Sequence, residues 1–420
     1  MKIFADLHLH SKYARATSKE MDIEILSNYA KIKGLNLLGT GDFTHPKQLE
    51  DIKTKLEPIE DKGLYKYNEV FFMLTTEMAT FYFQDNKSRR VHHIVTSPSV
   101  EIIDQIIDVL SRNGANTGID GRMMMKISSP ELVELLKQIS SDIHIIPAHI
   151  WTPYFGCLGS VTGFDSIKDC YLDKTKNIHS VETGLSSDPT MNWRLSELDD
   201  YVLLSNSDSH SPWPWRLGRE ANVFDLKEPD YFKIWDAIKS KDRKKISYTI
   251  EVDPNYGKYH FTGHSKCGVF MHPKEALKQK NICPICKKQM TIGVLQRLEE
   301  LADREEGFIP KTAIPFKSLL PLYEIISFVR GSNQLYSKKI IQEQDKIISF
   351  FGNELEVLIN ADFDSLVKVT DEKIANAIID IRERKIIFRP GYDGTYGEPI
   401  FDKDKKIQVK KSPQKSLSDF

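Results

Sequence analysis

The first ten residues form an apolar run that ends in two histidines, His8 and His10. Residues two apart on a β-strand point to the same face of a sheet, so both imidazoles can bind one metal ion. A similar apolar run, followed by residues of the types that bind metals, recurs six more times before residue 211. The residues that follow these runs are Asp42 with His45, Glu77, His92 with His93, His149, Glu182, and Asp208 with His210. Polar residues gathered at strand ends are typical of the active face of an α/β barrel.

Helical patterns lie between most of the predicted strands. Apolar residues recur at helical spacing in residues 22–33, 99–113 and 130–139, and Gly34 and Gly114 end the first two patterns. Alternation of strands and helices predicts an α/β fold with a mainly parallel sheet, here closed into a barrel. We therefore expect residues 1–250 to form this barrel, and a chain of 420 residues to hold further domains.

The composition excludes several classes of protein. Contents of 40% hydrophobic and 28% charged residues are ordinary for a globular protein with a large core. A net charge of −1 gives no overall positive field, so any surface for nucleic acid has to be local. The sequence has no apolar run of about 18 residues, so we expect no contact with a membrane. Five cysteines, three of them close together, fit a metal site in a reducing compartment, and we expect a cytoplasmic protein.

The histidines concentrate in the predicted barrel. Nine of the 12 histidines lie between residues 8 and 210, most of them at predicted strand ends. The alternative, that they are hydrogen-bonded core residues, fits each one singly but not the set with Asp42, Glu77 and Asp208. So many ligands predict two or three divalent metals. Mixed histidine and carboxylate ligation suits zinc, manganese or iron better than calcium, and magnesium is a further candidate.

The predicted metals indicate hydrolysis by an activated water. A bound divalent metal lowers the pKa of water and stabilises charge on a phosphoryl group. The sequence contains no Gly-x-Ser-x-Gly motif, no Ser-His-Asp order and no phosphate-binding loop that would indicate another mechanism.

The order of these motifs resembles the polymerase and histidinol phosphatase (PHP) superfamily. The resemblance implies a distorted (β/α)7 barrel that holds up to three metals and hydrolyses phosphate esters. It implies that four residues share metals at the barrel centre: His8, His10, Glu77 and Asp208. His93 and His149 would bind a further ion, and the set would be completed by Asp42, His45 and His210. Glu182 is an added carboxylate that would bind a third metal or support another ligand. The catalytic residues would then be His8, His10, Glu77, Asp208 and His210.

His92 and His93 are adjacent, and alternation along a strand lets only one of them face the barrel interior. We expect His93 to be the ligand because an apolar Ile-Val run follows it.

A second metal site is predicted in residues 251–292. His264 and Cys267 are three residues apart, as are Cys283 and Cys286. Two pairs with this spacing, each in a tight turn, can bind one zinc ion together. We expect these four residues to bind one structural zinc, with His260 or His272 as alternatives to His264. A redox-active Cys-x-x-Cys is the other possible reading, but it lacks a thioredoxin-like strand and helix around it.

The remainder of the chain has mainly helical patterns and is predicted to be a DNA-binding domain over residues 293–400. Residues 363–382 resemble a helix-hairpin-helix but lack its glycine, and a plain helical packing unit is the alternative. The turn-rich stretch 391–397 carries Tyr392 and Tyr396 next to basic residues, which suits stacking on a base, or else forms surface turns. Residues 401–420 are rich in lysine, and we expect a disordered basic tail.

The second half of the chain extends the resemblance to one family. The Gly263-His264-x-x-Cys267-Gly268 and Cys283-Pro284-x-Cys286 motifs, the helix 293–304 and the 391–397 loop together resemble the endonuclease Q family of DNA-repair enzymes. This resemblance implies incision of DNA on the 5′ side of deaminated bases (uracil, hypoxanthine, xanthine) and of abasic sites. Two alternatives are a PHP phosphatase of a small metabolite and a binding module with a degenerate barrel.

Damaged DNA as the partner requires a pocket for a base that has left the duplex. The loops after the later strands are rich in aromatic and polar residues, and they supply the candidates Trp151, Tyr154, Phe155, Ser186, Asn192, Trp193, Arg194, Trp213 and Arg216, with Tyr392 and Tyr396. The tryptophans could instead pack the rim of the barrel. Basic residues such as Arg122 and Arg219 could contact phosphates. A sliding clamp is a further candidate partner, although the tail holds no clear clamp-binding peptide.

Overall fold

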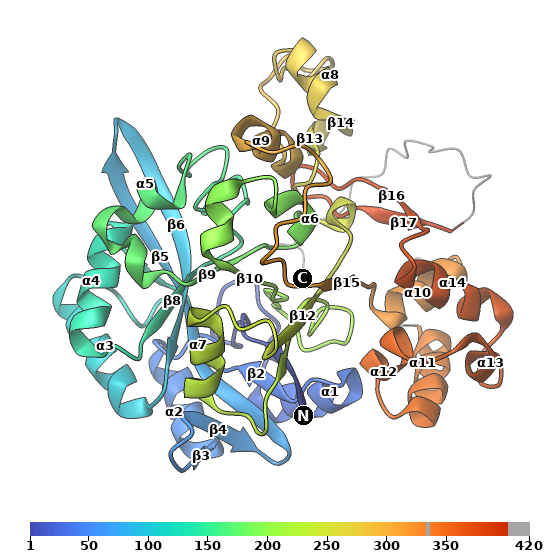
Figure 1. Ribbon diagram of the computed structural model, residues 1–420, viewed down its shortest axis with the longest axis horizontal. Coiled ribbons are helices and arrows are strands. Elements are labelled where there is room, and N and C mark those ends of the chain that lie inside the picture. The colour runs from blue at the N-terminus through green and yellow to red at the C-terminus, as the bar shows by residue number, and fades with distance from the viewer. Residues whose placement is uncertain (333–336, 402–420) are drawn as a thin grey trace.

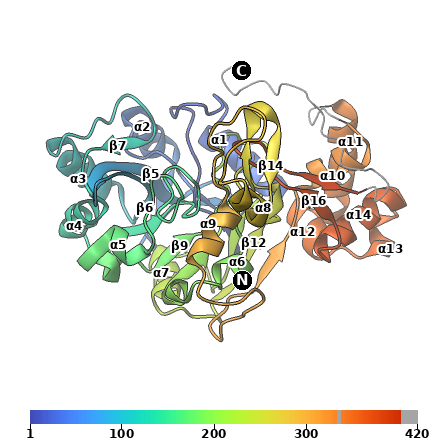
Figure 2. The same cartoon turned by 90° about the horizontal axis from the view of Figure 1, so that it is seen from above.

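The structure is a computed structural model that describes residues 1–332 and 337–401 (Figures 1 and 2). Its centre is an 11-stranded mixed sheet in which the main path of neighbouring strands is β15-β12-β11-β1-β2-β5-β4-β3, and β6, β7 and β8 join through β5. The strands are β1 (Lys2–Asp6), β2 (Leu37–Gly39), β3 (Glu57–Ile59), β4 (Leu64–Tyr67), β5 (Val70–Gln84), β6 (Lys87–Ser97), β7 (Met123–Met125), β8 (His144–Pro147), β11 (Ala221–Asp225), β12 (Ile246–Glu251) and β15 (Phe316–Ser318).

Strand contacts continue from the large sheet into a ring. Strands β1, β2 and β5 are parallel neighbours, and β5 leads through β6 to β8. A bridge between Ile145 and Ile178 connects β8 to the parallel pair β9 (Ser180–Glu182) and β10 (Val202–Leu204). A second bridge, between Leu9 and Ser209, returns from the end of β10 to the end of β1. The polar strand ends therefore meet around one centre.

The expectation of a mainly parallel sheet is wrong for part of this ring. Strands β5 and β6 form a long antiparallel hairpin, and β6 with β8 and β1 with β11 are also antiparallel. The hairpin turn consists of Asp85 and Asn86, with φ of 53° and 58°. A two-residue turn with both φ values positive matches the twist of paired strands, so it favours a hairpin over a helical crossover. Glu77 consequently lies in the middle of β5 and not at a strand end.

Seven α-helices accompany these strands: α1 (Ile23–Lys33), α2 (Pro46–Lys55), α3 (Val100–Arg112), α4 (Ser129–Ile139), α5 (Ile167–Tyr171), α6 (Pro189–Asn192) and α7 (Tyr231–Lys239). The three predicted helical patterns are confirmed. Helix α1 begins after Asp22, whose side chain accepts from the amide of Glu24, and ends at Gly34 with φ of 99°. Helices α3, α4 and α5 lie together on one flank of the molecule (Figures 1 and 2).

Apolar side chains fill both faces of the sheet. On one face, Ile3, Leu37 and Phe224 are fully buried beneath Trp235 and Ile238 of α7. Burial of each such side chain contributes about 1.5–3 kcal/mol, so this layer fixes the strands whose ends carry the polar residues.

The segment from β13 (Thr262–His264) to α8 (Pro273–Lys278) and the loop after it project beyond the large sheet at the top of Figure 1 as a small unit. It contains the antiparallel pair of β13 and β14 (Val269–Met271), followed by α8. Helix α9 (Val294–Leu301) follows it and contacts both α6 and β13. The described part of the chain also has 3-10 turns: η1 (Leu172–Asn177) and η2 (Ser196–Asp200) flank β9, whereas η3 (Pro254–Tyr256) and η4 (Ser265–Cys267) follow β12.

The C-terminal helices form a bundle on the flank opposite α3–α5 (Figures 1 and 2). They are α10 (Leu322–Val329), α11 (Lys338–Phe351), α12 (Glu354–Ile359), α13 (Phe363–Leu366) and α14 (Glu372–Arg382), and the pair β16 (Ile387–Arg389) and β17 (Glu398–Ile400) follows. A fully buried ion pair of 2.7 Å between Lys33 and Glu354 joins α1 to the start of α12.

The residues that resemble a helix-hairpin-helix are α13, a turn and α14. The carboxylate of Asp371 accepts from the amides of Lys373 and Ile374 and caps α14. These amides are therefore not free for a phosphate, which favours the plain helical packing unit. Apart from residue 401, the predicted tail lies outside the described residues. Over the described part of the chain, no helix combines the length and the apolar character that a membrane crossing requires.

Candidate metal centre

Seven side chains of ligand type converge where the strands of the ring meet. Three groups each bring their donor atoms within 4.8 Å of one another: His8 with His10 and Glu77, His10 with Asp208 and His210, and Glu77 with His92 and His149. The groups overlap through His10 and Glu77, so they form one continuous cluster. We call it the seven-residue cluster, and its members are His8, His10, Glu77, His92, His149, Asp208 and His210.

Glu77 bridges the two halves of this cluster. Its Oε1 lies 2.6 Å from Nδ1 of His92 and 3.0 Å from Nε2 of His149. The same oxygen is 3.6 Å from Nε2 of His8, and Oε2 is 3.5 Å from Nε2 of His10. A carboxylate with histidines against both oxygens would be able to supply an oxygen to more than one bound metal ion.

Asp208 faces Glu77 from the other side of the cluster. Its Oδ1 lies 3.1 Å from Nε2 of His10, 3.6 Å from Nε2 of His8 and 3.7 Å from Nδ1 of His210. The Asp208 side chain is 35% exposed, whereas those of His8, His10 and Glu77 are at most 1% exposed. Asp208 and His210 therefore form the side of the cluster that a substrate can reach.

Two buried atoms of the cluster lack a hydrogen-bond partner. Among the residues that the structure describes, Nε2 of His8 and Oε2 of Glu77 make no hydrogen bond. A buried polar atom without a partner is costly, and a metal ion removes that cost. The donor set of imidazole nitrogens and carboxylate oxygens therefore fits divalent metals.

Three residues at the site have left-handed backbone conformations, which are unfavourable for residues other than glycine. Asp42, His149 and Asp208 have φ of 48°, 29° and 47°. Left-handed backbone at residues other than glycine is uncommon, and it occurs mostly where function requires a particular side-chain direction. Each of these residues follows a different strand, so the chain changes direction after β2, β8 and β10 at the site.

Asp42 and Glu182 lie behind histidines of the cluster, not among its donors. Oδ1 of Asp42 is 3.2 Å from Nδ1 of His10, and its Oδ2 accepts from the amide and hydroxyl of Ser11. Glu182 accepts from Nδ1 of His8 at 3.1 Å and from the amide of His149 at 2.7 Å. Both carboxylates orient imidazoles whose other nitrogen faces the cluster. Asp42, which we expected to be a metal ligand, thus occupies a supporting position, and Glu182 occupies the supporting position that was one of its two predicted roles.

The expectation that His93 faces the site is wrong. His92 contacts Glu77, while His93 points to the opposite face, where its nitrogens lie 2.8 Å from Tyr171 Oη and 3.1 Å from Thr80 Oγ1. The pairing of β5 with β6 places His92 opposite Ala79, on the face that also carries Glu77.

His45 was also predicted to be a metal ligand, but it is not a member of the seven-residue cluster. It is the residue before Pro46 at the start of α2, and its ring stacks on Tyr13 at 4.9 Å. In the described structure it belongs to none of the three donor groups. Proline at the first position of α2 favours extended backbone at the residue before it, and His45 has this conformation.

Asn206 is a supporting residue that sequence reasoning missed. Its Nδ2 donates to Glu182 at 2.8 Å, and its Oδ1 accepts from the amide of Leu7. It stands at the end of β10, two residues before Asp208, and this strand-end position is the signal that could have identified it.

Electrostatics hold protons on the inner histidines. Burial disfavours the charged form of His8, but the carboxylates of Glu182, Asp208 and Glu77 outweigh it and raise its pKa to about 9. The same opposition, led by Asp42, raises the pKa of His10 to about 10. Despite burial, the surrounding histidines lower the pKa values of Glu77 and Asp208. A metal entering this site must therefore displace protons from imidazoles.

The tryptophans predicted to contact a base are divided between packing and the site rim. Trp151 is 1% exposed, and its Nε1 donates to Oδ1 of Asn192 at 2.8 Å. Trp193 is also buried, and Trp213 stacks on Trp215 at 5.7 Å. Packing of the rim therefore accounts for Trp151, Trp193 and Asn192.

Two neighbouring aromatic residues remain close to the cluster. The ring of Phe155 lies 4.3 Å from that of His92, and Tyr154 beside it is 45% exposed. Ser186 accepts from the amide of Tyr259, and the half-buried Arg194 accepts two backbone amides of residues 303 and 304 at its carbonyl. Of the loop residues, Tyr154 and Phe155 are the best placed to contact a substrate.

The C-terminal candidates differ in their accessibility. Tyr392 is 6% exposed and packs on Phe270 at 5.0 Å, so its face is not available for stacking on a base. Arg216 forms an ion pair of 2.9 Å with Glu324 of α10. Tyr396 is partly exposed beside Arg216 and Arg219.

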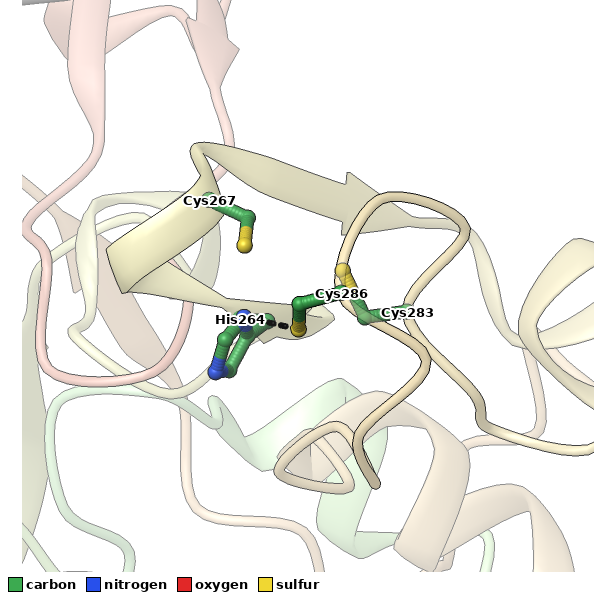
Figure 3. Close-up of side chains that lie close together, drawn as sticks. All are labelled: His264, Cys267, Cys283 and Cys286. Atoms are coloured by element: carbon green, nitrogen blue, oxygen red, sulfur yellow. Dashed lines mark hydrogen bonds between the residues drawn. The ribbon is translucent and has the colours of Figure 1, made fainter.

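The second predicted metal site is assembled as a four-ligand group of His264, Cys267, Cys283 and Cys286 (Figure 3). His264 ends β13 and Cys267 follows in η4, while Cys283 and Cys286 come from a loop that faces them (Figure 3). Nδ1 of His264 lies 3.5 Å from Sγ of Cys286. One imidazole and three thiols in such proximity form a ligand set of the kind that binds structural zinc.

The alternatives to His264 lie elsewhere. His260 is buried with Nδ1 against the carbonyl of Ser186, and His272 caps α8.

Burial opposes ionisation of Cys283, but backbone hydrogen bonds from Cys286 and Ile285 outweigh it and lower the pKa of the thiol to about 7. Amide donors to a thiolate prepare it for a metal.

Two sequence comparisons relate the chain to known proteins. Residues 321–385 match the family model of the MJ0043 C-terminal domain. The chain is 40% identical over 275 residues to the protein MJ0043 of Methanocaldococcus jannaschii. That match covers 64% of this chain and 33% of the relative, so the chain spans about a third of the relative's length.

Two crystal structures match nearly the whole chain. One is the lesion-specific endonuclease PfuEndoQ from Pyrococcus furiosus, with 34% identity, a TM-score of 0.85, and coverage of 97% of this chain and 98% of that one. The other is endonuclease Q in complex with a 27-mer duplex substrate that has an abasic lesion at the active site. Its identity is 35%, its TM-score is 0.87, and coverage is 97% of this chain and 99% of that one. On this similarity over its full length, the chain belongs to the endonuclease Q family.

Proposed function

We propose that this protein is a metal-dependent DNA-repair endonuclease. It hydrolyses the phosphodiester on the 5′ side of deaminated bases (uracil, hypoxanthine, xanthine) and of abasic sites. The observation that carries the proposal is the seven-residue cluster, in a chain similar over its full length to an endonuclease Q bound to abasic DNA. The ring of strand contacts supports a distorted PHP barrel over residues 1–250, with a zinc-binding module at 251–292 and a mainly helical domain at 293–400.

The cluster would hold two or three divalent metals. The number is supported by the three donor groups of the cluster. Because these groups share Glu77 and His10, ions bound to them would lie close together. Zinc, manganese or magnesium bound there would supply a water of lowered pKa and a positive charge against the phosphoryl oxygens.

The residues of the chain have separate tasks in this reaction. His8, His10 and Glu77 hold the buried side of the centre, and Glu182 and Asp42 keep the imidazoles in the required tautomer. Asp208 and His210 lie on the exposed side, next to the position of the scissile phosphate. Arg122, whose guanidinium lies 3.9 Å from Glu77, adds a positive charge where the transition state gathers negative charge.

A duplex hides the base, so the lesion has to leave the stack before its 5′ phosphate reaches the cluster. Flipping costs a few kcal/mol and is least costly for mispaired or missing bases, which favours lesions over normal DNA. Tyr154 and Phe155 lie at the rim beside His92 and are placed to contact the displaced nucleotide. The four-ligand group would bind one zinc that stabilises the module between the two larger domains.

The test is incision of labelled duplexes that differ at one position. Duplexes with uracil, hypoxanthine, xanthine or an abasic site should be cut on the 5′ side, leaving a 3′-hydroxyl and a 5′-phosphate, and a chelator should stop the reaction. An otherwise identical undamaged duplex should remain intact. Equal cutting of the undamaged duplex would contradict lesion specificity. Hydrolysis of small phosphomonoesters without incision would favour a metabolite phosphatase.

A further inference from the structure

Three cations surround the ring of Tyr396 in the loop between β16 and β17. Nζ of Lys258 lies 4.7 Å from the ring centroid, and the guanidinium carbons of Arg216 and Arg219 lie 5.0 Å and 5.7 Å from it. Arg219 also donates to the Tyr396 hydroxyl at 3.0 Å. We call this arrangement the cationic pocket, formed by Arg216, Arg219, Lys258 and Tyr396.

The protein balances only part of the positive charge of the cationic pocket. Arg216 pairs with Glu324, a carboxylate that also accepts from Tyr256. Within the described ranges, no carboxylate lies within 4.0 Å of Arg219 or Lys258, although Arg219 is only 5% exposed. A buried cation without a counter-ion is unfavourable, so an anion from outside the chain would stabilise this arrangement.

Two other buried carboxyl groups, Glu220 and Glu251, do not supply the missing charge. Burial and the proximity of Glu251 hold the pKa of Glu220 well above its usual range, and burial raises the pKa of Glu251 to about 8. Conversely, burial raises the pKa of the Tyr396 hydroxyl, but the three cations outweigh it and lower that pKa to about 7. Glu324 and an ionised Tyr396 together offset at most two of the three positive charges, so the pocket retains a net positive charge at neutral pH.

The cationic pocket lies next to the metal centre. Nε and Nη2 of Arg219 donate to the carbonyl of Ser207 at 3.2 Å and 2.9 Å. Ser207 directly precedes Asp208, the most exposed carboxylate of the cluster. Lys258, Arg216 and Tyr396 are each partly exposed, so the pocket is open to a ligand in solution.

We propose that Arg216, Arg219, Lys258 and the Tyr396 hydroxyl bind one backbone phosphate of the DNA strand, close to the phosphate that is cut. This inference rests on the proposed function and adds a phosphate site to it. Guanidinium and ammonium groups with a hydroxyl are the usual donors to a phosphate, and such contacts fix the position of the strand without reading its sequence. The site would hold the strand while the lesion enters the centre.

Lys258 offers the cleanest test because its ammonium makes no ion pair in the described structure. Binding is measured by fluorescence anisotropy with the full-length protein and a labelled duplex carrying an abasic-site analogue, over a series of KCl concentrations. All variants carry Asp208→Asn, so that the duplex is not cut. Lys258→Gln should reduce the slope of log Kd against log salt by about 0.9, the value for one lost phosphate contact.

Two variants serve as controls. Lys258→Arg keeps the charge and should retain the parent slope. Lys66→Gln, on β4 beside the start of β5, removes an exposed charge at the end of the sheet away from Glu77, and should also leave the slope unchanged. An unchanged slope for Lys258→Gln would overturn the proposed phosphate site while leaving the nuclease proposal intact. Failure of the wild-type protein to bind and incise lesion DNA would overturn both.

Discussion

Nδ1 of His8 lies 3.1 Å from both carboxylate oxygens of Glu182, which also accept from the amide of His149 and the side chain of Asn206. This contact keeps the proton of His8 on Nδ1 and leaves Nε2 as a metal donor towards Glu77 and Asp208. Glu182 therefore orients the proposed metal ligand His8 without being a metal ligand itself.

Glu182→Gln should weaken metal binding by about 10–100-fold without removing a donor atom, because an amide holds the His8 tautomer less firmly than a carboxylate. Metal content after dialysis and titration calorimetry measure the effect. Glu372→Gln, an exposed carboxylate on α14, is the matched control and should bind metal like the wild type. Equal affinities for the two variants would rule out the orienting role of Glu182.

His92 and His93 should respond in opposite ways to substitution. His92→Ala removes a donor beside Glu77 and should lower both metal content and incision, with a small change in Tm. His93→Ala removes the buried partner of the Tyr171 hydroxyl and one of the partners of Thr80, and should cost about 1–3 kcal/mol of unfolding free energy while metal content is retained. Loss of metal in His93→Ala with normal metal in His92→Ala would contradict the register of β5 and β6.

Metal affinity should depend on pH over an unusually high range. The folded-state pKa values of His8 and His10 are raised to about 9 and about 10, so both imidazoles are protonated in the metal-free protein at neutral pH. A protonated imidazole cannot bind a metal, and metal uptake must release these protons. Apparent affinity should therefore rise from pH 7 through about pH 9. Calorimetry in buffers of different ionisation enthalpy counts the protons, and an affinity that levels off below pH 8 would disagree with raised pKa values.

Cys283→Ser should remove the structural metal from the four-ligand group and destabilise the module around it, because metal binding free energy there is folding free energy. Zinc release measured with a colorimetric chelator, together with thermal unfolding, follows both effects. Cys170→Ser is a control in a buried cysteine outside that group and should keep its zinc. An unchanged zinc content in Cys283→Ser would refute the assignment of this thiol as a ligand.

The sequence predicted those parts of the centre that follow from local periodicity. His8 and His10 share a face because β1 has a period of two, and the spacing of the two Cys and His pairs predicted the four-ligand group. The alternation rule was also correct for His92 and His93, but it does not say which histidine faces inward. The Asp85-Asn86 turn determines that, since it pairs Gln84 with Lys87 and so places His92 on the face of Glu77.

Other features depend on long-range packing, which periodicity does not contain. Asp42 and Glu182 each approach Nδ1 of a histidine on the side away from the cluster. Periodicity does not reveal this contact, so it could not distinguish a carboxylate that orients a histidine from one that binds a metal. The burial of Trp151 depends on its hydrogen bond to Asn192, 41 residues away. Likewise, the cationic pocket joins Arg219 to Tyr396, which are separated by 177 residues.

The most direct test of the account is the rate at which Asp208→Asn incises a duplex with one abasic site, under single-turnover conditions with saturating protein and metal. Loss of a charged ligand on the exposed side of the centre removes several kcal/mol of charge stabilisation, so the rate should fall by about a thousand-fold while the Kd for the duplex stays within a few-fold of wild type. Incision by Asp208→Asn at the wild-type rate would contradict a catalytic centre built on the seven-residue cluster.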